Sequence, residues 1–254
     1  MLRRRRLRHR APGYRADQSS SQANSLSQTQ GAAVKKFDLN PMPAPLDSKY
    51  VDLLSEVETA TVGHFRHWGF MAPDIKPINH SRKIIGTAVT LSLPGQDSTL
   101  LHHSLSLLRP GDILVIDRLG DQKHACLGGG VALGAVLAGA QGAIIDGMCT
   151  DPSELEAYNF PVWARGVSPI TTRIYNIGGQ LNKPVACGGA VVNAGDIILA
   201  DENGVLVLPP DEVAEVSRMA LEKQARGNSN GERMRGGERL GDLSGASKYV
   251  LEQA

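Results

Sequence analysis

The sequence predicts an α/β domain in which helices cover a mixed β-sheet. Two observations support this fold class. Between about residues 47 and 158, short apolar runs of strand length alternate with stretches whose apolar residues have helical spacing. Between residues 162 and 208, apolar runs follow one another and are separated by Gly, Asn and Asp, which are typical turn residues. With 254 residues, 41% of them hydrophobic, the chain is long enough to bury such a core.

In the first half of the domain, helices and strands are expected to alternate. Asp47 or Ser48 is suited to cap the first helix, and Asp97 or Ser98 the second, because these side chains accept hydrogen bonds from free backbone N–H groups. Pro152 is suited to the first turn of the last helix, where its missing N–H costs nothing. The expected elements are helices at 47–66, 97–109, 128–137 and 152–158, and strands at 84–93, 113–116 and 143–145.

The second half is expected to consist mainly of strands. The sequence Glu202-Asn203-Gly204 predicts a hairpin, because Asn-Gly readily adopts the positive φ of tight turns. A final helix at 210–225 is expected to close the domain, with Pro at its start and Gly227 just after its end. The expected strands lie at 162–164, 185–192, 197–200 and 205–208.

The two ends of the chain differ in composition from this domain. Residues 1–15 contain seven Arg and no acid, and the following residues are rich in Ser and Gln, so this region buries too little apolar surface to fold. We therefore expect a disordered Arg/Ser-rich leader at 1–40, a catalytic-type domain at 45–227 and a loose tail at 228–254. The leader is compatible with a mitochondrial transit peptide if the source is eukaryotic, with weak RNA binding, or with a plain flexible tail.

Composition excludes several classes of protein. Lys and Arg number 27 and Asp and Glu 26, and aromatic residues make up 4% of the chain, so neither a strongly basic surface nor stacking platforms favour DNA binding. No apolar run is long enough to span a membrane. Three Cys, an odd and small number, argue against a disulfide framework and favour a reducing, cytoplasmic location.

Three consecutive glycines, Gly128, Gly129 and Gly130, precede an expected helix. Backbone N–H groups at a helix N-terminus attract anions, and glycine lets a ligand approach the chain closely. This pattern favours a carboxylate or a phosphate as ligand. A role in packing or turn formation is the alternative, because the sequence matches neither a Walker loop nor a dinucleotide-binding motif.

Asp146 and Asp151 follow an expected strand, at the end where α/β proteins commonly bind ligands. Their carboxylate oxygens suit Mg²⁺ or Mn²⁺. In the alternative interpretation, Asp146 orders a turn and Asp151 caps the next helix. Two neighbours are further candidates: His124 for proton transfer, and Cys149 either as a nucleophile or as a small buried core residue.

Six motifs extend these local patterns along the domain: GDILVID (111–117), ACLGGGV (125–131), GAQGAIIDG (139–147), FPVWARGVSP (160–169), PVACGGAVV (184–192) and GDIILADENGV (195–205). In their order and spacing, from about Tyr50 to Ala225, the chain resembles the RraA-like family. That family includes 4-hydroxy-4-methyl-2-oxoglutarate/4-carboxy-4-hydroxy-2-oxoadipate aldolases and the regulator of ribonuclease E activity.

The resemblance implies a fold and a chemistry. The expected fold is a compact β/β/α sandwich of the RraA-like, swivelling type, assembled as a homotrimer or a dimer of trimers with active sites between subunits. The expected activity is that of a lyase that needs Mg²⁺ or Mn²⁺, acts on a small-molecule 2-oxo acid and releases pyruvate. Many relatives also decarboxylate oxaloacetate.

The resemblance also implies site residues. The family loop that holds the pyruvoyl carboxylate on backbone N–H groups corresponds to Gly128, Gly129, Gly130 and Val131. The family motif Asp-Gly-x-x-Arg-Asp corresponds to residues 146–151, which read DGMCTD, so that the metal-binding Asp is Asp151.

Two positions depart from the family pattern. Thr150 stands where the family has an Arg that grips the substrate, and Gly129 stands where an acid is common. An Arg offers a permanently charged, bidentate clamp, whereas Thr offers one neutral hydroxyl. Arg165 is a candidate to supply the missing charge from elsewhere in the chain.

Three functions therefore remain open. The first is a metal-dependent lyase in which Thr150 takes part of the role of the missing Arg, with Thr150 and Asp151 as catalytic residues. The second is a non-catalytic regulatory protein that binds a ribonuclease or RNA. The third is an enzyme on the same scaffold that acts on a different substrate, one without a second carboxylate.

Overall fold

Four parallel strands form the centre of the main sheet. The computed structural model describes residues 35–79 and 82–254. In this part of the chain the central strands are hydrogen-bonded in the order β3, β4, β6 and β7. Their bounds are β3 (Ile84–Ser92), β4 (Asp112–Asp117), β6 (Gly142–Cys149) and β7 (Val162–Val167). The mixed α/β fold expected from the sequence is confirmed.

Shorter strands extend this sheet on both sides. A hairpin of β11 and β12 pairs antiparallel with the first half of β3, and β8 pairs with its end. The strand β5 pairs with the end of β6, and β9 and β10 form a separate antiparallel pair. The bounds are β1 (Phe37–Leu39), β2 (Lys76–Pro77), β5 (Ala125–Leu127), β8 (Gly179–Leu181), β9 (Val185–Cys187), β10 (Ala190–Val192), β11 (Ile197–Asp201) and β12 (Gly204–Leu208).

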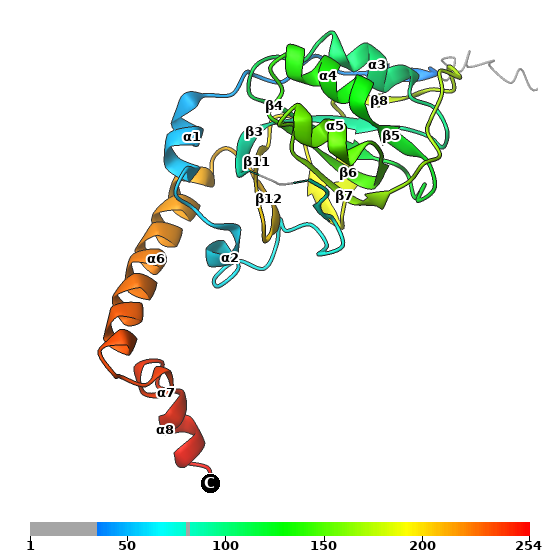
Figure 1. The fold of residues 1–254 in the computed structure, drawn as a ribbon. Helices are drawn as coiled ribbons and strands as arrows, with labels where there is room; N and C mark the ends of the chain where they lie inside the picture. The colour runs from blue at the N-terminus through cyan, green and yellow to red at the C-terminus, as the bar shows by residue number, and fades with distance from the viewer. Residues whose placement is uncertain (1–34, 80–81) are drawn as a thin grey trace, which may run out of the picture. The chain divides into compact units, whose positions relative to one another are not determined.

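Both faces of the central strands are buried, and alternate side chains serve each face. In β4, Leu114 and Ile116 belong to the core beneath α3 (Thr99–Leu105), α4 (Gly129–Leu137) and α5 (Pro152–Ala157), which lie together on one side of the sheet (Figure 1). Ile113 and Val115 belong to the opposite core, which includes residues of β9, β10, β11 and β12. Each fully buried aliphatic side chain of this kind contributes roughly 1.5–3 kcal/mol to the hydrophobic term.

A third core packs three helices, two near the start of the domain and one that follows β12, against the hairpin of β11 and β12. It involves α1 (Ser48–Leu54), α2 (Thr59–Val62) and the first half of α6 (Val213–Arg235). Two short helices follow, α7 (Leu240–Leu243) and α8 (Ala246–Leu251).

The helix expected at 47–66 is wrong in its extent. Asp47 does cap α1, accepting a hydrogen bond from the backbone N–H of Lys49 at 3.0 Å. The helix then ends at Leu54 and a separate turn forms α2. The backbone N–H and the hydroxyl of Thr59 donate to the buried carboxylate of Asp201, at 2.8 Å and 2.6 Å, instead of continuing one helix.

Both end regions also differ from expectation. Within the expected leader 1–40, residues 37–39 form β1, which pairs in parallel with β8; residues 1–34 lie outside the described residues. Helix α6 continues to Arg235, so Gly227 lies inside it and does not end it. The expected loose tail at 228–254 is therefore largely helical, although its side chains are mostly exposed.

Candidate functional site

The ends of β5 and β6 and the starts of α4 and α5 meet around a pocket of about 210 Å³. It contains every site residue that the family motifs predicted. These are Gly128, Gly129, Gly130, Val131, Thr150 and Asp151. The remaining lining residues are Ser98, His102, Ala125, Cys126, Thr171 and Thr172. Residues from four separate parts of the sequence thus surround one space.

The glycines allow the start of α4 to lie against the chain that follows β6. A Cβ added to Gly128 would overlap the Asp151 carboxylate and the methyl group of Thr150. At Gly130, by contrast, an added Cβ would meet no atom within 4 Å. Gly128 is therefore required by close packing within the site, whereas Gly130 leaves open space toward the solvent.

Two backbone donors remain open at this helix start. The first N–H groups of a helix have no intrahelical acceptor and carry a partial positive charge. Gly129 N–H is satisfied by Asp151 Oδ2 at 3.0 Å. The N–H groups of Gly130 and Val131 have no hydrogen-bond acceptor among the described residues. They can receive an anionic group of a ligand.

Asp151 holds an unusual backbone conformation. Its φ of 57° and ψ of 48° lie in the left-handed region, which Asp and Asn tolerate better than most residues. Its side chain does not cap α5, which begins at Pro152; it reaches across to the start of α4. The Thr150 hydroxyl donates to Asp151 Oδ1 at 3.1 Å. The capping alternative for Asp151 is wrong, and Thr150 orients the carboxylate.

A second carboxylate stands beside Gly129. A Cβ added to Gly129 would overlap the carboxylate of Glu154, a residue of α5. The absence of a side chain at Gly129 therefore leaves room for an acid that arrives from another helix. The start of α4 therefore has two exposed carboxylates beside it, Asp151 next to Gly128 and Glu154 next to Gly129.

A buried arginine lies behind the pocket wall. Arg118 is fully buried, and its Nη2 donates to the carbonyl of Gly95 and lies 3.6 Å from Asp121 Oδ2. Its Nε and Nη1 have no hydrogen-bond partner in the structure. The charge of Arg118 acts on the Cys126 thiol, which lines the pocket. Asp121, which is paired with Arg118, acts on the same thiol in the opposite direction, so Arg118 does not leave an unbalanced positive charge on this side of the pocket.

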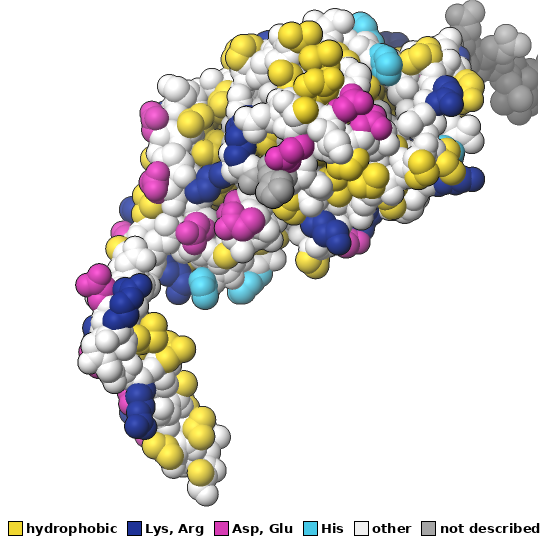
Figure 2. All heavy atoms as spheres, in the orientation of Figure 1, with side chains coloured by type: hydrophobic (Ala, Val, Ile, Leu, Met, Phe, Trp, Pro, Cys, Tyr) yellow, Lys and Arg dark blue, Asp and Glu magenta, His cyan; other side chains and the backbone are white. Residues whose placement is uncertain are grey.

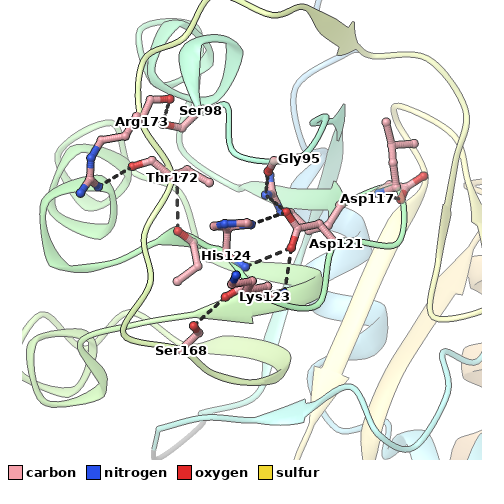
Figure 3. A network of polar contacts seen from close by, with 12 residues as sticks. Gly95, Ser98, Asp117, Asp121, Lys123, His124, Ser168, Thr172 and Arg173 are labelled. Carbon is pink, nitrogen blue, oxygen red and sulfur yellow. Dashed lines mark hydrogen bonds and ion pairs between the residues drawn. The ribbon is translucent and has the colours of Figure 1, made fainter.

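The segment 168–178, between β7 and β8, contributes Thr171 and Thr172 to the wall of the pocket. Figure 3 shows how it is tied to β5 and to the start of α3. The hydroxyls of Ser168, Thr172 and Ser98 donate to the carbonyls of Lys123, Ala125 and Arg173, at 2.6, 3.4 and 3.2 Å respectively.

The carboxylate of Asp97 also binds segment 168–178. Its buried carboxylate accepts hydrogen bonds from the backbone N–H groups of Tyr175 at 3.0 Å and Ile177 at 2.7 Å, and from Thr99. Burial raises the pKa of Asp97, but the hydrogen bonds from Thr99, Tyr175 and Ile177 outweigh it and hold that pKa well below its usual value. Asp97, rather than Ser98, supplies the capping bond to α3.

Several sequence candidates lie outside the pocket. Asp146 is paired with Arg165 and accepts a hydrogen bond from Gly188 N–H at 2.7 Å. Arg165 also pairs with Asp74 and does not line the pocket, so the expectation that it supplies the missing charge is wrong. Asp146 and Asp151 are therefore not brought together. Asp146 lies within β6, which continues to Cys149, so the alternative that it orders a turn is also wrong.

His124 and Cys149 are also set aside by the structure. His124 Nδ1 lies 2.7 Å from Asp121 Oδ2, and the residue does not line the pocket (Figure 3). Cys149 is fully buried, and burial raises the pKa of its thiol to about 12. A protonated, inaccessible thiol is a poor nucleophile. The core interpretation of Cys149 is confirmed.

His102 is the functional candidate that sequence reasoning missed. It lies on α3, which follows the carboxyl end of β3, at the same edge of the sheet as the ends of β5 and β6. Parallel strands gather the first turns of their following helices at one edge, and that signal could have identified it.

The described residues show neither a membrane span nor a preformed cluster of metal ligands. No helix there is long and apolar enough to cross a membrane. In the same part of the chain, no group of three or more His, Cys, Asp or Glu is placed to hold a metal ion.

The sequence is similar to a known protein family and to several named proteins. The family model RraA-like, described as Aldolase/RraA, matches residues 55–207. A Halalkalibacterium halodurans protein named "Putative 4-hydroxy-4-methyl-2-oxoglutarate aldolase" is 34% identical over 151 residues, covering 59% of this chain and 71% of that protein. An uncharacterized protein of Methanocaldococcus jannaschii is 31% identical over 172 residues, covering 66% of this chain and 82% of its own.

A solved structure is also similar to this chain in fold. Streptomyces coelicolor RraAS2, described as an unusual member of the RNase ES inhibitor RraA protein family, superimposes with a TM-score of 0.63 at 26% identity. The match covers 74% of this chain and 98% of that one.

Proposed function

Because the chain belongs to the RraA-like family, we propose that it is a divalent-metal-dependent lyase that cleaves a small 2-oxo acid and releases pyruvate. The observation that carries the proposal is the shared pocket of the open α4 N-terminus and Asp151. A 2-oxo acid presents a carboxylate and a neighbouring carbonyl oxygen. The open N–H groups of α4 are suited to the carboxylate, and a metal ion held by Asp151 is suited to the carbonyl oxygen.

The donor set is compatible with Mg²⁺ or Mn²⁺. Mg²⁺ commonly keeps several waters and uses only one or two protein carboxylates. Asp151 is exposed at the pocket, its two oxygens are oriented by Gly129 N–H and the Thr150 hydroxyl, and each retains a free lone pair. Glu154 adds a second carboxylate next to Gly129. These residues would hold such an ion, which supplies a Lewis acid for the substrate's keto oxygen.

The chain's own residues then bind and orient the substrate. The N–H groups of Gly130 and Val131 receive the substrate carboxylate, and the partial charge of the helix N-terminus strengthens these hydrogen bonds. Thr150 keeps the Asp151 carboxylate in one orientation. The wall formed by segment 168–178 limits access from one side. Together these contacts hold the scissile carbon–carbon bond next to the groups that stabilise negative charge.

The departures from the family pattern suggest how the substrate differs. Thr150 carries no charge, and removing a preorganised charged donor commonly lowers a rate by about 10²–10³-fold. Buried Arg118 is paired with Asp121 and does not line the pocket, so it does not replace the missing charged donor. The missing charge at Thr150 favours a second candidate function. It is that of an enzyme on the same scaffold whose substrate lacks the second carboxylate.

Pyruvate release tests the proposal. Oxaloacetate and 4-hydroxy-4-methyl-2-oxoglutarate are supplied with and without Mg²⁺ or Mn²⁺, and pyruvate is coupled to NADH oxidation by lactate dehydrogenase. We expect metal-dependent turnover in the wild type, loss of turnover in Asp151→Asn, and about 10²-fold higher kcat/KM in Thr150→Arg, which restores the charged clamp.

The other outcomes separate the alternatives. Turnover in Thr150→Arg alone would favour the same-scaffold enzyme with a different substrate. If neither form releases pyruvate with either metal, the lyase proposal fails. The remaining candidates would then be a non-catalytic protein, like the RNase ES inhibitor family that the similar solved structure represents, and an enzyme on the same scaffold with different chemistry.

A further inference from the structure

The proposed reaction needs a group that moves a proton, and the pocket contains a side chain suited to do so. We propose that His102 is the proton-transfer residue of this site. The proposal rests on the proposed function and deepens it. It assigns proton transfer to a side chain of α3, whereas the proposed function gives the glycines and Asp151 the binding of the carboxylate and the metal ion.

The other polar groups of the pocket are already engaged. The hydroxyls of Ser98, Thr172 and Thr150 donate to Arg173 O, Ala125 O and Asp151 Oδ1, as described above. Asp151 accepts two hydrogen bonds and belongs to the metal-binding set. A hydroxyl also ionises far above neutral pH and makes a weak acid or base there.

Cys126 is unsuited for a different reason. It is almost completely buried, and its thiol holds its proton tightly because burial raises its pKa to about 11. An imidazole ordinarily titrates near neutral pH. The side chain of His102 is exposed at the pocket and makes no hydrogen bond or ion pair within the described residues.

The surroundings of His102 leave this imidazole free to exchange protons. Helix α3 packs against α4 and β8, and neither of these elements carries an ionisable side chain. The charged groups near the pocket are Asp151, Glu154 beside Gly129, the Arg118–Asp121 pair behind Cys126, and Arg173, which donates to the lining residue Thr171. By contrast, the imidazole of His124 is bound to Asp121.

The proton balance is simple. In aldol cleavage, His102 takes the proton of the C4 hydroxyl as the C3–C4 bond breaks, and a carbonyl product leaves. The electron pair of that bond forms the pyruvate enolate, and the imidazolium returns its proton to C3, giving pyruvate. In decarboxylation of oxaloacetate, carbon dioxide leaves in place of the carbonyl product. The proton given to C3 is then replaced from water.

His102→Gln and His103→Gln form a matched pair of variants. The two residues are adjacent on α3 and both are exposed, but only His102 lines the pocket. The full-length protein is assayed with Mn²⁺ for pyruvate release across pH, and for exchange of the pyruvate methyl protons in D₂O, followed by NMR. The exchange assay reports proton transfer at C3 without carbon–carbon cleavage.

We expect His102→Gln to lower kcat and the exchange rate by about 10²-fold or more, with KM changed less than about threefold. It should also remove one limb of the pH profile, while His103→Gln stays within about twofold of the wild type. If the wild type turns over and the two variants behave alike, the role of His102 is overturned and the proposed lyase stands. If the wild type neither releases pyruvate nor catalyses exchange, both are overturned.

Discussion

At the residue scale, the two outer glycines of the 128–130 loop have opposite surroundings. Gly128 has extended backbone angles that any residue adopts, so only close packing excludes a side chain there. Gly130 has open space where its Cβ would lie. The same substitution at the two positions therefore separates the effect of contact with Asp151 from the effect of losing a glycine.

Gly128→Ala is predicted to weaken metal binding. The added methyl would displace the Asp151 carboxylate from Gly129 N–H and push against Thr150. We expect about a tenfold loss of Mn²⁺ affinity, equivalent to about 1.4 kcal/mol, measured by calorimetric titration. Gly130→Ala is the control. It should keep the wild-type affinity and, as a helical position, gain a few tenths of a kcal/mol up to about 1 kcal/mol of stability. Equal affinities in the two variants would contradict the assignment of Asp151.

The sequence predicted which residues line the pocket better than it predicted which groups those residues contact. Gly128, Gly129, Thr150 and Asp151 were placed in one site by motif spacing, and the structure gathers them. Their contacts depend on chain geometry that a motif does not contain. The left-handed conformation of Asp151 turns its side chain toward α4 instead of α5, and no sequence pattern here indicates that turn.

Asp146 shows the converse limit. It is five positions before Asp151, but it lies on β6, where successive side chains alternate between faces. Its carboxylate is directed to Arg165 and to the backbone of Gly188, near the buried Cys187. Closeness in sequence therefore did not bring the two acids together.

At the scale of elements, one carboxylate fastens the wall of the pocket. The segment 168–178 has no regular secondary structure of its own, and Asp97 accepts hydrogen bonds from three of its backbone N–H groups, those of Tyr175, Ile177 and Gly178. Because the buried Asp97 also bonds Thr99 at the start of α3, it couples the segment to the helix that carries His102.

Asp97→Asn is predicted to loosen this wall. The variant exchanges an acceptor-only carboxylate for an amide whose NH₂ cannot accept, leaving buried donors unsatisfied. We expect a loss of about 1–3 kcal/mol of unfolding free energy at pH 7, measured by urea denaturation. Hydrogen exchange at Tyr175 and Ile177 should accelerate. Asp52→Asn, an exposed acid on α1, should change neither quantity.

The contribution of Asp97 to the free energy of unfolding should depend on pH. The pKa of Asp97 is lower in the folded protein than its unfolded value of 3.8, so its stabilising effect is fully present above that value. The effect is lost progressively as the pH falls below about 3.8, because the unfolded state then binds a proton at this site more readily than the folded state does. The stability difference between wild type and Asp97→Asn should therefore shrink on acidification. A difference that stays constant from pH 7 to pH 3 would contradict this account.

Element boundaries were predicted less well where tertiary contacts compete with local preference. The break between α1 and α2 follows from the attraction of Thr59 to Asp201, a residue 142 positions away. Helix α6 extends past Gly227, whose cost in a helix is only about 1 kcal/mol. Charged pairs such as Arg218–Glu222 support its exposed surface, each by a few tenths of a kcal/mol.

At the scale of the whole molecule, the order of the motifs predicted the fold class correctly, because each motif contains all or part of at least one strand. The sequence alone could not show which surfaces are left uncovered. Figure 2 shows hydrophobic side chains along one side of the C-terminal helices α7 and α8. Leu240, Tyr249, Val250 and Leu251 are each more than 60% exposed.

Self-association is the last prediction. Helices as short as α7 and α8 are marginal in water without a packed apolar face. An exposed apolar stripe of this kind marks a contact surface. We expect the protein to form a homo-oligomer, with a mass near 81 kDa for three chains of 27.1 kDa, or a multiple of that trimer. Sedimentation at several protein concentrations measures it.

Charge introduced into the stripe should dissociate this assembly. The double substitution Tyr249→Asp and Leu251→Asp would bury two carboxylates in an apolar contact, which is costly unless they are paired. Gln253→Asp adds a charge at the same helix end, on a residue that is already polar and exposed, and should leave the mass unchanged. A wild type that sediments as a single 27.1 kDa chain would contradict the prediction. If instead the double variant keeps the oligomer intact, the subunits meet through another surface, and the apolar side chains of segment 168–178 become the next to test, because Ile174 and Tyr175 are also more than half exposed there.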